Sequence, residues 1–242
     1  MKLKIIGSGN ARSKEICAST LIDDTILVDA GHGVYKKLLQ ENVDIKSLEA
    51  IFITHLHTDH FIDLTAIVAH RNILKDDDPN VPTLRIYLPV GGIEALRVIA
   101  LNTLDQNIDP DTWMHFSSKI KEYNNRPIHF KDYEIKALKV DHAAMVPSYG
   151  LIFKTKDHIV GFSGDSKTCP NITKIIETSD TLVIDTSYPT ECIFHMGLDT
   201  VINFAEKYPE KLFLGTHIST EVRNLKPKLP KNLHLLRDGE IY

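Results

Sequence analysis

Residues 51–60 read IFITHLHTDH. A short apolar run, residues 51–53, leads through Thr54 into three histidines and an aspartate. Runs of this length that are rich in β-branched residues predict a buried strand. Imidazole and carboxylate groups are ligands for zinc, and for manganese or iron as the share of carboxylates rises. The segment therefore predicts a strand that ends in a metal-binding cluster; the alternative is a set of surface histidines around a turn.

Four further apolar runs are followed by an acid or a histidine. Residues 26–28 precede Asp29, residues 138–140 precede Asp141 and His142, residues 159–164 precede Asp165, and residues 212–216 precede His217. Sheets of this kind place their ligands at the carboxyl ends of strands, so we expect these side chains to meet. Taken alone, His142 is equally well explained as a partly buried structural histidine, and Asp165 as a turn carboxylate.

The pattern of the whole chain is that of a mixed α/β protein. The 242 residues are 43% apolar and 25% charged, with a formal net charge of −4, which excludes disordered, collagen-like and coiled-coil chains. Helical patterns alternate with the strands at residues 34–41, 61–74, 93–104, 172–178 and 198–207. Residues 76–80 are expected to form a polar loop and residues 107–125 a surface excursion. We expect one domain over residues 1–242.

Cysteine usage and charge limit the setting in which the protein works. Cys17, Cys169 and Cys192 are far apart and form no CxxC pair, which fits a reducing compartment and argues against disulfides or a thiolate zinc site. No run has the length of a signal-peptide core or a membrane span. We therefore expect a cytoplasmic protein with no membrane partner, and the mildly acidic balance provides no general attraction to nucleic acid.

The motif HLHTDH, together with His142, Asp165 and His217, resembles the metallo-β-lactamase superfamily. This resemblance implies an αββα four-layer sandwich, in which two mixed sheets are flanked by helices. It also implies two divalent metal ions, zinc first, with manganese or iron as alternatives. The implied ligands are His55, His57 and His142 for one ion and Asp59, His60 and His217 for the other, with Asp165 bridging them and Asp29 orienting a ligand histidine.

The chemistry of these seven side chains agrees with that division. Seven such ligands give each of two ions three or four protein ligands and leave a position for a shared water. Two cations a few ångströms apart lower the pKa of that water and supply a metal-bridging hydroxide at neutral pH.

A narrower resemblance is to ribonuclease Z and related phosphodiesterases. It rests on residues 147–153 (PSYGLIF), 182–185 (LVID) and 195–199 (HMGLD). It implies that His195, with Asp185, protonates the leaving oxygen, and Asp59 is counted with them among the catalytic residues. From the local sequence alone, His195 is equally well an ordinary surface histidine, and Asp185 an ordinary strand-end carboxylate.

The sequence departs from that pattern at two points, and the second bears on the substrate. Asp63 stands where the family usually has glycine, and only 22 residues separate His142 from Asp165. Ribonuclease Z carries a long flexible arm between the counterparts of these two residues, and 22 residues leave no room for it. RNA is therefore not the favoured partner.

The leading hypothesis is a dinuclear phosphodiesterase that cleaves a nucleotide-like or other small anionic phosphodiester. The alternatives are a lactone, thioester or amide hydrolase with the same metal centre, a ribonuclease Z-like endonuclease without the arm, and a binding module without turnover. The sequence does not decide the oligomeric state; relatives are often dimers, so a homodimer is an open alternative by analogy alone. Two further groups of residues could contact the substrate. For the basic residues the alternative is a solvated tail: Arg223, Lys226, Lys228 and Lys231. For the aromatic residues the alternative is a place in the core: Trp113, Tyr149, Tyr188 and Phe194.

Overall fold

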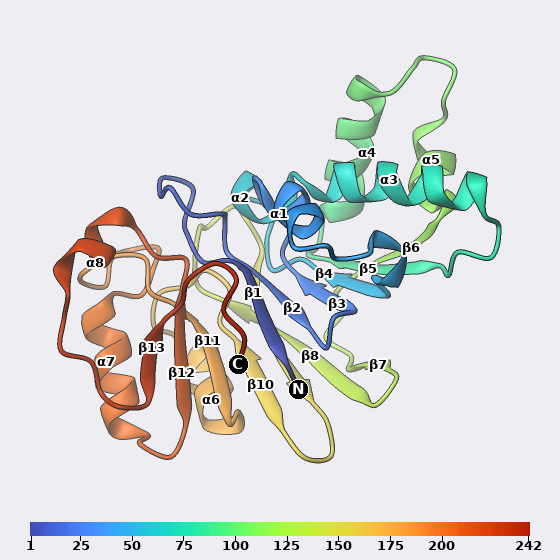
Figure 1. Cartoon of the computed structure of the whole chain (residues 1–242). Coiled ribbons are helices and arrows are strands. Elements are labelled where there is room, and N and C mark those ends of the chain that lie inside the picture. The colour runs from blue at the N-terminus through green and yellow to red at the C-terminus, as the bar shows by residue number, and fades with distance from the viewer.

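The computed structural model describes all 242 residues and contains two mixed β-sheets that pack face to face (Figure 1). The first sheet has six strands in the order β1-β2-β3-β4-β5-β6. Its strands are β1 (Leu3–Gly7), β2 (Ser19–Ile22), β3 (Ile26–Val28), β4 (Ala50–Phe52), β5 (Leu84–Leu88) and β6 (Ser118–Glu122). The strands from β1 to β3 pair antiparallel, and those from β3 to β6 pair parallel.

The second sheet has seven strands in the order β13-β12-β11-β10-β9-β8-β7. They are β7 (Ile128–Phe130), β8 (Tyr133–Val140), β9 (Ser148–Lys154), β10 (Ile159–Phe162), β11 (Thr181–Asp185), β12 (Leu212–Thr216) and β13 (Leu233–Leu235). The strands from β7 to β10 pair antiparallel, and those from β10 to β13 pair parallel. Both sheets are therefore mixed, as expected.

Helices cover the outer face of each sheet, which completes four layers. On the first sheet lie α1 (Val34–Gln40), α2 (Thr58–Phe61), α3 (Leu64–Asp77), α4 (Gly92–Thr103) and α5 (Pro110–Phe116), with a 3-10 turn at Ile45–Ser47. On the second lie α6 (Pro170–Thr178), α7 (Leu198–Lys207) and α8 (Thr220–Leu225). Each group packs its apolar stripe onto the neighbouring strands. The αββα sandwich is confirmed.

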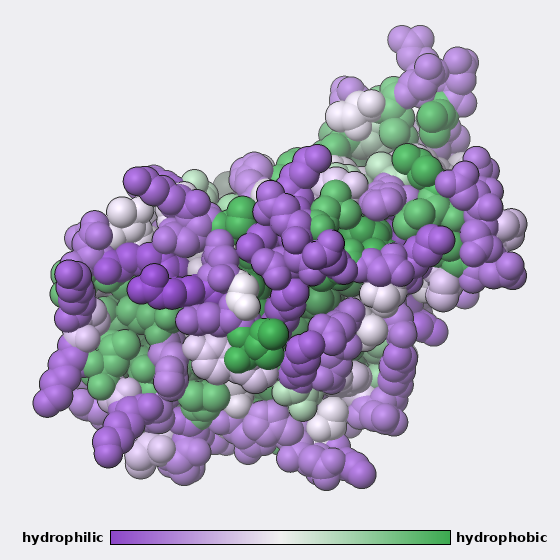
Figure 2. All heavy atoms as spheres, viewed as in Figure 1, coloured by the Kyte–Doolittle hydropathy of each residue, from purple (hydrophilic) through white to green (hydrophobic).

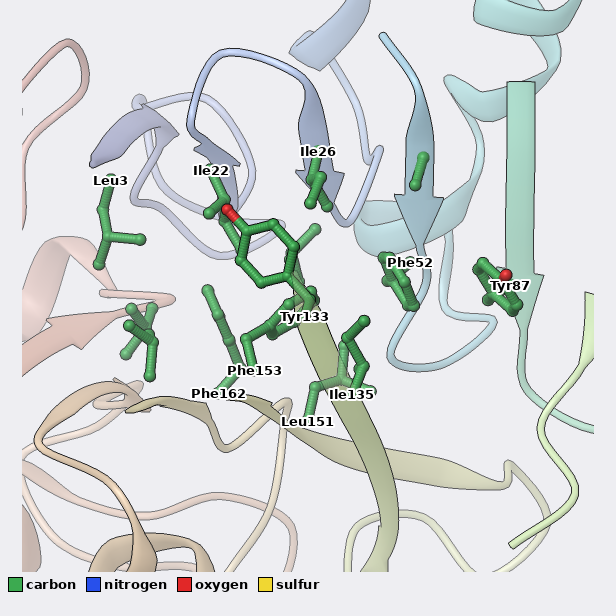
Figure 3. Packing of buried hydrophobic residues seen from close by; sticks show 14 of the residues in the cluster. Leu3, Ile22, Ile26, Phe52, Tyr87, Tyr133, Ile135, Leu151, Phe153 and Phe162 are labelled. Atoms are coloured by element: carbon green, nitrogen blue, oxygen red, sulfur yellow. The ribbon is translucent and has the colours of Figure 1, made fainter. Parts of the chain in front are cut away.

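The inner faces of the two sheets share one apolar core (Figure 3). Phe52 of the first sheet stacks on Tyr87 at 4.7 Å between ring centroids and meets Phe153 of the second sheet edge-on at 5.1 Å. Residues of β8 alternate, so that Tyr133 and Ile135 point into this core. Burying an aromatic or aliphatic side chain of this size contributes about 1.5–3 kcal/mol, so this layer holds the sheets together.

The strand registers bring polar residues to one edge of the sandwich. Val28 at the end of β3 lies opposite Phe52 at the end of β4, and Asp185 at the end of β11 lies opposite Thr216 at the end of β12. These pairs are parallel, so Asp29 and the segment after β4 leave the first sheet together. In the second sheet, Asp185 and His217 do the same.

Residues 107–125 differ from the expected surface excursion. They form α5 and β6, and Met114 and Ile120 are buried. Asp109 accepts a hydrogen bond from the Thr112 amide at 2.8 Å and caps α5, while β6 is stabilised by parallel pairing with β5. The helix α5 depends on its cap, and the strand β6 depends on pairing with a distant strand. Neither can be predicted from the spacing of apolar residues.

Two smaller boundaries also differ. The helix expected over residues 61–74 is α3, which begins at Leu64 and continues through Asp77 into the expected polar loop, while Phe61 is the last residue of the separate short helix α2. The break falls at Asp63, whose amide donates to the Ala30 carbonyl at 2.9 Å instead of continuing α2.

The face seen in Figure 2 is mainly hydrophilic, and hydrophobic side chains show on it in scattered groups, some of them near the helical projection of α3 to α5. The exposed apolar residues of this region are Ile73, Val98, Leu101, Ile108 and Phe116. None of the helices combines the length and apolar character needed to cross a bilayer.

Candidate metal centre and active site

The seven expected ligands come from four places in the chain and meet at the edge described above. His55 and His57 follow β4, while Asp59 and His60 lie in α2. The other three follow β8, β10 and β12: His142, Asp165 and His217. All except His57 are buried. Their potential ligand atoms form overlapping groups, and within each group the atoms lie within 4.8 Å of one another.

The first group consists of three imidazoles. His57 Nδ1 lies 3.1 Å from His55 Nε2 and 3.1 Å from His142 Nε2. The opposite nitrogens of two rings are already engaged: His142 Nδ1 donates to the Phe194 carbonyl at 2.8 Å, and His55 Nδ1 lies 3.1 Å from Thr54 Oγ1. The Thr54 hydroxyl gives its own hydrogen to a carboxylate, so it accepts from His55. Nε2 of His55 and of His142 therefore present lone pairs to the centre.

The second group contains one carboxylate and two imidazoles. His217 Nε2 lies 3.2 Å from Asp59 Oδ2, and His60 Nε2 lies 3.8 Å from the same oxygen. Asp165 lies between the two groups. Its Oδ2 is 3.3 Å from His60 Nε2, 3.3 Å from His217 Nε2 and 3.7 Å from His55 Nε2.

The rings of the second group are held by partners behind them. Asp29 Oδ2 accepts from His60 Nδ1 at 2.8 Å. The residue has φ +63°, in the left-handed region that Asp and Asn tolerate best among non-glycine residues. Ser187 Oγ donates to Asp185 and therefore accepts from His217 Nδ1 at 2.7 Å. These bonds fix the orientation of both rings and direct Nε2 toward the centre.

The chemistry of the donor set fits divalent cations. The nitrogens and carboxylate oxygens that converge here are mainly lone-pair acceptors, and few of them can donate a hydrogen bond to another. His60 Nε2 is buried without a hydrogen-bond partner, because its 3.3 Å approach to Asp165 lacks hydrogen-bond geometry. A cation would satisfy such atoms, whereas leaving them buried and unpaired is costly.

The pKa shifts agree with this chemistry for most members. Burial lowers the pKa of His55 well below its ordinary value, so its ring is neutral. Burial opposes ionisation of Asp165, but the imidazoles of His217 and His60 lower its pKa well below the usual range. Burial likewise opposes protonation of His60, yet Asp165 and Asp29 raise its pKa, so a cation would compete with a proton for that ring.

His195 lies beside the seven residues and is paired with Asp185. Its Nδ1 is 2.9 Å from Asp185 Oδ2, and its ring stacks on that of His217 at 5.4 Å. Burial opposes protonation, but the Asp185 carboxylate raises the pKa of His195 to about 9. At neutral pH this imidazole carries a proton that it can give away.

A cavity of about 390 Å³ opens in front of the centre. Among the aromatic residues singled out above, Tyr188 and Phe194 line it, whereas Tyr149 belongs to the core between the sheets and Trp113 packs against the helices of the first sheet. Arg223 is neither free nor part of a solvated tail: it pairs with Glu15 at 3.1 Å.

Sequence reasoning missed several residues at this site. Ser187 and the Phe194 carbonyl orient the histidines expected to be ligands, and Asn10 and Arg12 line the cavity. Ser187 had a local signal, since it lies two residues after Asp185 at a strand end. Phe194 was named only for its aromatic ring, and Asn10 and Arg12 had no signal, because their proximity depends on the fold.

The arrangement of layers and the position of this centre at the strand ends define a metallo-β-lactamase-fold protein. A family model described as "Anti-Pycsar protein Apyc1" matches residues 1–242, and the chain belongs to that family.

Similar sequences carry the name ribonuclease Z, which confirms the narrower resemblance. The protein of Thermococcus gammatolerans is 29% identical over 163 residues, covering 65% of this chain and 48% of the relative. That of Thermococcus sibiricus is 32% identical over 134 residues, with 55% and 40% covered. This chain thus spans half or less of these relatives. The protein of Latilactobacillus sakei is 24% identical over 307 aligned residues, with 100% and 97% covered.

Solved structures share the fold over the whole chain. The metallo-β-lactamase fold protein YhfI from Bacillus subtilis has a TM-score of 0.80 at 20% identity, covering 100% of this chain and 98% of its own. A diphosphatase of the PhnP family has a TM-score of 0.77 at 18% identity, with 100% and 96% covered. The short form of human tRNase Z has a TM-score of 0.75 at 18% identity, with 100% and 98% covered.

Proposed function

We propose that this chain acts, as one domain, as a metal-dependent hydrolase whose substrate is a small, anionic, nucleotide-like phosphodiester. The observation that carries the proposal is the pair formed by His195 and Asp185 beside the convergent ligand set. A phosphodiester needs a proton for its departing alkoxide, and this pair holds one at the right place. The ribonuclease Z relatives support the same class of reaction.

The proposed ligands are the same as those implied by the resemblance. His55, His57 and His142 would hold one divalent cation; Asp59, His60 and His217 would hold the other, with Asp165 shared between them. When bound, such cations polarise the phosphoryl oxygens and make hydroxide available from water at neutral pH. Zinc suits this imidazole-rich set best, with manganese or iron as alternatives.

His195 completes the reaction as general acid. A water that has lost one proton to solvent bonds as hydroxide to phosphorus, the bond to the leaving oxygen breaks, and Nε2 of the His195 ring gives its proton to that oxygen. Asp185 accepts the Nδ1 hydrogen throughout and stabilises the charged ring. Asp59 has a depressed pKa: burial opposes its ionisation, but His217 and His60 lower it, so this carboxylate stays ionised beside the substrate.

A ribonuclease Z-like endonuclease is the second candidate, favoured by the names of the relatives. Only residues 155–158 connect β9 to β10, so the arm between these strands is absent. A compact substrate that enters the 390 Å³ cavity fits this chain better than an RNA docked along an arm.

Three free cysteines, Cys17, Cys169 and Cys192, support a reducing compartment such as the cytoplasm. Homodimer formation stays a prediction.

The test measures metal content and turnover on the same sample. Purified protein should carry about two metals per chain and hydrolyse bis(4-nitrophenyl) phosphate. His195→Ala should retain the metals but lose roughly 100-fold or more in kcat on a nucleotidyl phosphodiester, whose alkoxide leaving group needs a proton, since general acids contribute about 10²–10⁴-fold. The loss should be smaller on bis(4-nitrophenyl) phosphate, because 4-nitrophenolate leaves without a proton. On an activated carbonyl ester the same variant should lose little. Metal-loaded protein that cleaves only carbonyl esters, with His195 dispensable, would instead establish the alternative hydrolase.

A further inference from the structure

The cavity in front of the metal centre has a polar wall that the proposed reaction does not yet use. Asn10 and Arg12 line this cavity together with His57, Asp59 and His195. Both lie in the loop between β1 and β2, which projects beyond the end of β1 in dark blue in Figure 1.

The Asn10 side chain is buried but offers an unused donor. Its exposed fraction is 6%, and its Oδ1 accepts a hydrogen bond from the Arg12 amide at 3.0 Å. That bond defines which end of the amide faces the loop, and Nδ2 has no acceptor in the protein. Nδ2 is not sealed off from solvent, so it can donate to a ligand in the cavity that Asn10 lines.

Arg12 adds a positive charge at the same wall. Its side chain is exposed and its guanidinium pairs with no carboxylate, unlike Arg223 and Arg97. Guanidinium and amide N–H groups are both donors only, so together they favour an acceptor-rich anion.

The loop that carries these residues is braced from the far end of the chain. Asp238 accepts from the amides of Ser8 and Ile16, at 2.9 Å each, and so closes the base of the loop. Arg223 Nη2 donates to Ser8 Oγ at 2.7 Å. The Ser8 carbonyl also accepts from the amide of Ile218, the residue after His217, at 2.9 Å. The wall is therefore tied to the ligand set and is held in position before any substrate arrives.

We propose that Asn10 and Arg12 form a substrate-binding subsite that holds oxygens of the phosphodiester which do not take part in bond breaking. Asp238 acts as a positioning residue for this subsite. The inference rests on the proposed function and specifies which groups outside the metal centre recognise the anion.

The test uses the metal-loaded full chain, with bis(4-nitrophenyl) phosphate as substrate and inorganic phosphate as inhibitor. Asn10→Asp keeps the oxygen that accepts from the Arg12 amide but replaces the free donor with a negative charge. Arg12→Gln removes the positive charge. Each should raise KM and the inhibition constant of phosphate about tenfold or more, the scale of one hydrogen bond to a charged group, with metal content unchanged. Arg126→Gln, a control at an exposed arginine that also lacks an ion pair, should leave both values unaltered.

Asp238→Asn tests the brace. This variant should raise KM more than it lowers kcat, and it should increase protease cleavage within residues 8–16. If Asp238 instead took part in bond breaking, its replacement would not increase cleavage of the loop. If Asn10→Asp does not fold, Asn10→Ser serves in its place, with circular dichroism as the check. Wild-type KM and phosphate inhibition in both Asn10 and Arg12 variants would overturn the subsite.

Calorimetric binding of phosphate separates this inference from the proposed function. If the wild-type protein is inert toward every phosphodiester yet binds phosphate in a way that depends on Asn10 and Arg12, the subsite stands and the reaction is wrong.

Discussion

At the scale of single residues, the site depends on which nitrogen of each histidine is left free. Asp29, the Phe194 carbonyl and Ser187 each accept a hydrogen from a proposed ligand histidine on the side away from the centre. Asp185 serves twice, because it orients Ser187 and also pairs with His195. One buried carboxylate thus couples the proposed metal ligands to the proposed acid.

Ser187→Ala tests this orientation. Removing the hydroxyl leaves His217 Nδ1 without its acceptor, so zinc affinity should fall about 10- to 100-fold, as is typical for partners behind a ligand. The measurement is a competition titration with a zinc chelator. Ser118→Ala is the matched control, because Ser118 is also buried but its hydroxyl has no hydrogen-bond partner. Equal affinities in the two variants would contradict the proposed role of Ser187.

At the scale of elements, polar side chains at the carboxyl ends of strands form the site, and contacts between helices support it. Asp63, found where the family usually has glycine, precedes α3, and its Oδ2 accepts from the Tyr35 amide in the first turn of α1 at 3.0 Å. It therefore caps one helix from the start of another. This departure affects helix packing and does not touch the ligand set.

Asp63→Ala should lower the free energy of unfolding by about 1 kcal/mol, the usual cost of losing a helix cap. Asp63→Asn should retain most of that stability, since its amide oxygen still accepts from Tyr35. Urea unfolding checks both variants. Asp157→Ala, at an exposed turn, is the control and should change stability by less than about 0.5 kcal/mol. An alanine variant at position 63 as stable as the wild type would exclude the cap.

At the scale of the whole molecule, the centre joins the two sheets. Four proposed ligands follow β4 of the first sheet, and the other three follow strands of the second. Bound cations would therefore connect the two halves of the sandwich, in addition to the apolar layer in Figure 3.

Removing the metals should lower the melting temperature. A ligand present at 100 times its Kd stabilises the folded state by about 2.7 kcal/mol. For a chain of this length that corresponds to roughly 5–10 °C, since each kcal/mol shifts Tm by about 2–4 °C. Calorimetry of chelator-treated and zinc-reloaded protein provides the comparison. A Tm that does not respond to zinc would show that the seven residues hold no cation in the folded state.

A second connection between the sheets is the hydrogen bond from the Tyr133 hydroxyl in β8 to Asp23 in the turn between β2 and β3. Burial opposes ionisation of Asp23, but the Lys2 amide and Tyr133 lower its pKa below 3.8. Its stabilising contribution is therefore present above that pH and is lost as the pH falls through the folded-state pKa.

Tyr133→Phe should accordingly cost about 1 kcal/mol of unfolding free energy at pH 7, a figure that allows for solvent screening around Asp23, and less at a pH below the folded-state pKa of Asp23. Urea unfolding at the two pH values measures this difference. Tyr208→Phe, which removes an exposed hydrogen bond to Glu177, is the control and should show a smaller loss at pH 7. A loss that is independent of pH would rule out the charged partner.

Local patterns in the sequence determined the strands β3, β4, β8, β10 and β12, the helix α7 and the placement of HLHTDH directly after β4. These features depend on the spacing of apolar residues and on the residue types directly after each strand, so neighbouring residues are enough to specify them. The helix α5 and the strand β6 were missed, because an Asp109 cap and pairing with a distant strand stabilise them.

Only the tertiary structure placed Asn10, Ser187, Arg223 and Asp238. Asp238 and Ser8 are 230 positions apart, and no periodicity links them. Their contacts exist because the core between the sheets aligns the carboxyl ends of strands from both halves of the chain. The chemical types of the proposed ligands could be identified from the linear chain, whereas their distances, the free nitrogen of each ring and the polar wall opposite them arise from packing between distant segments.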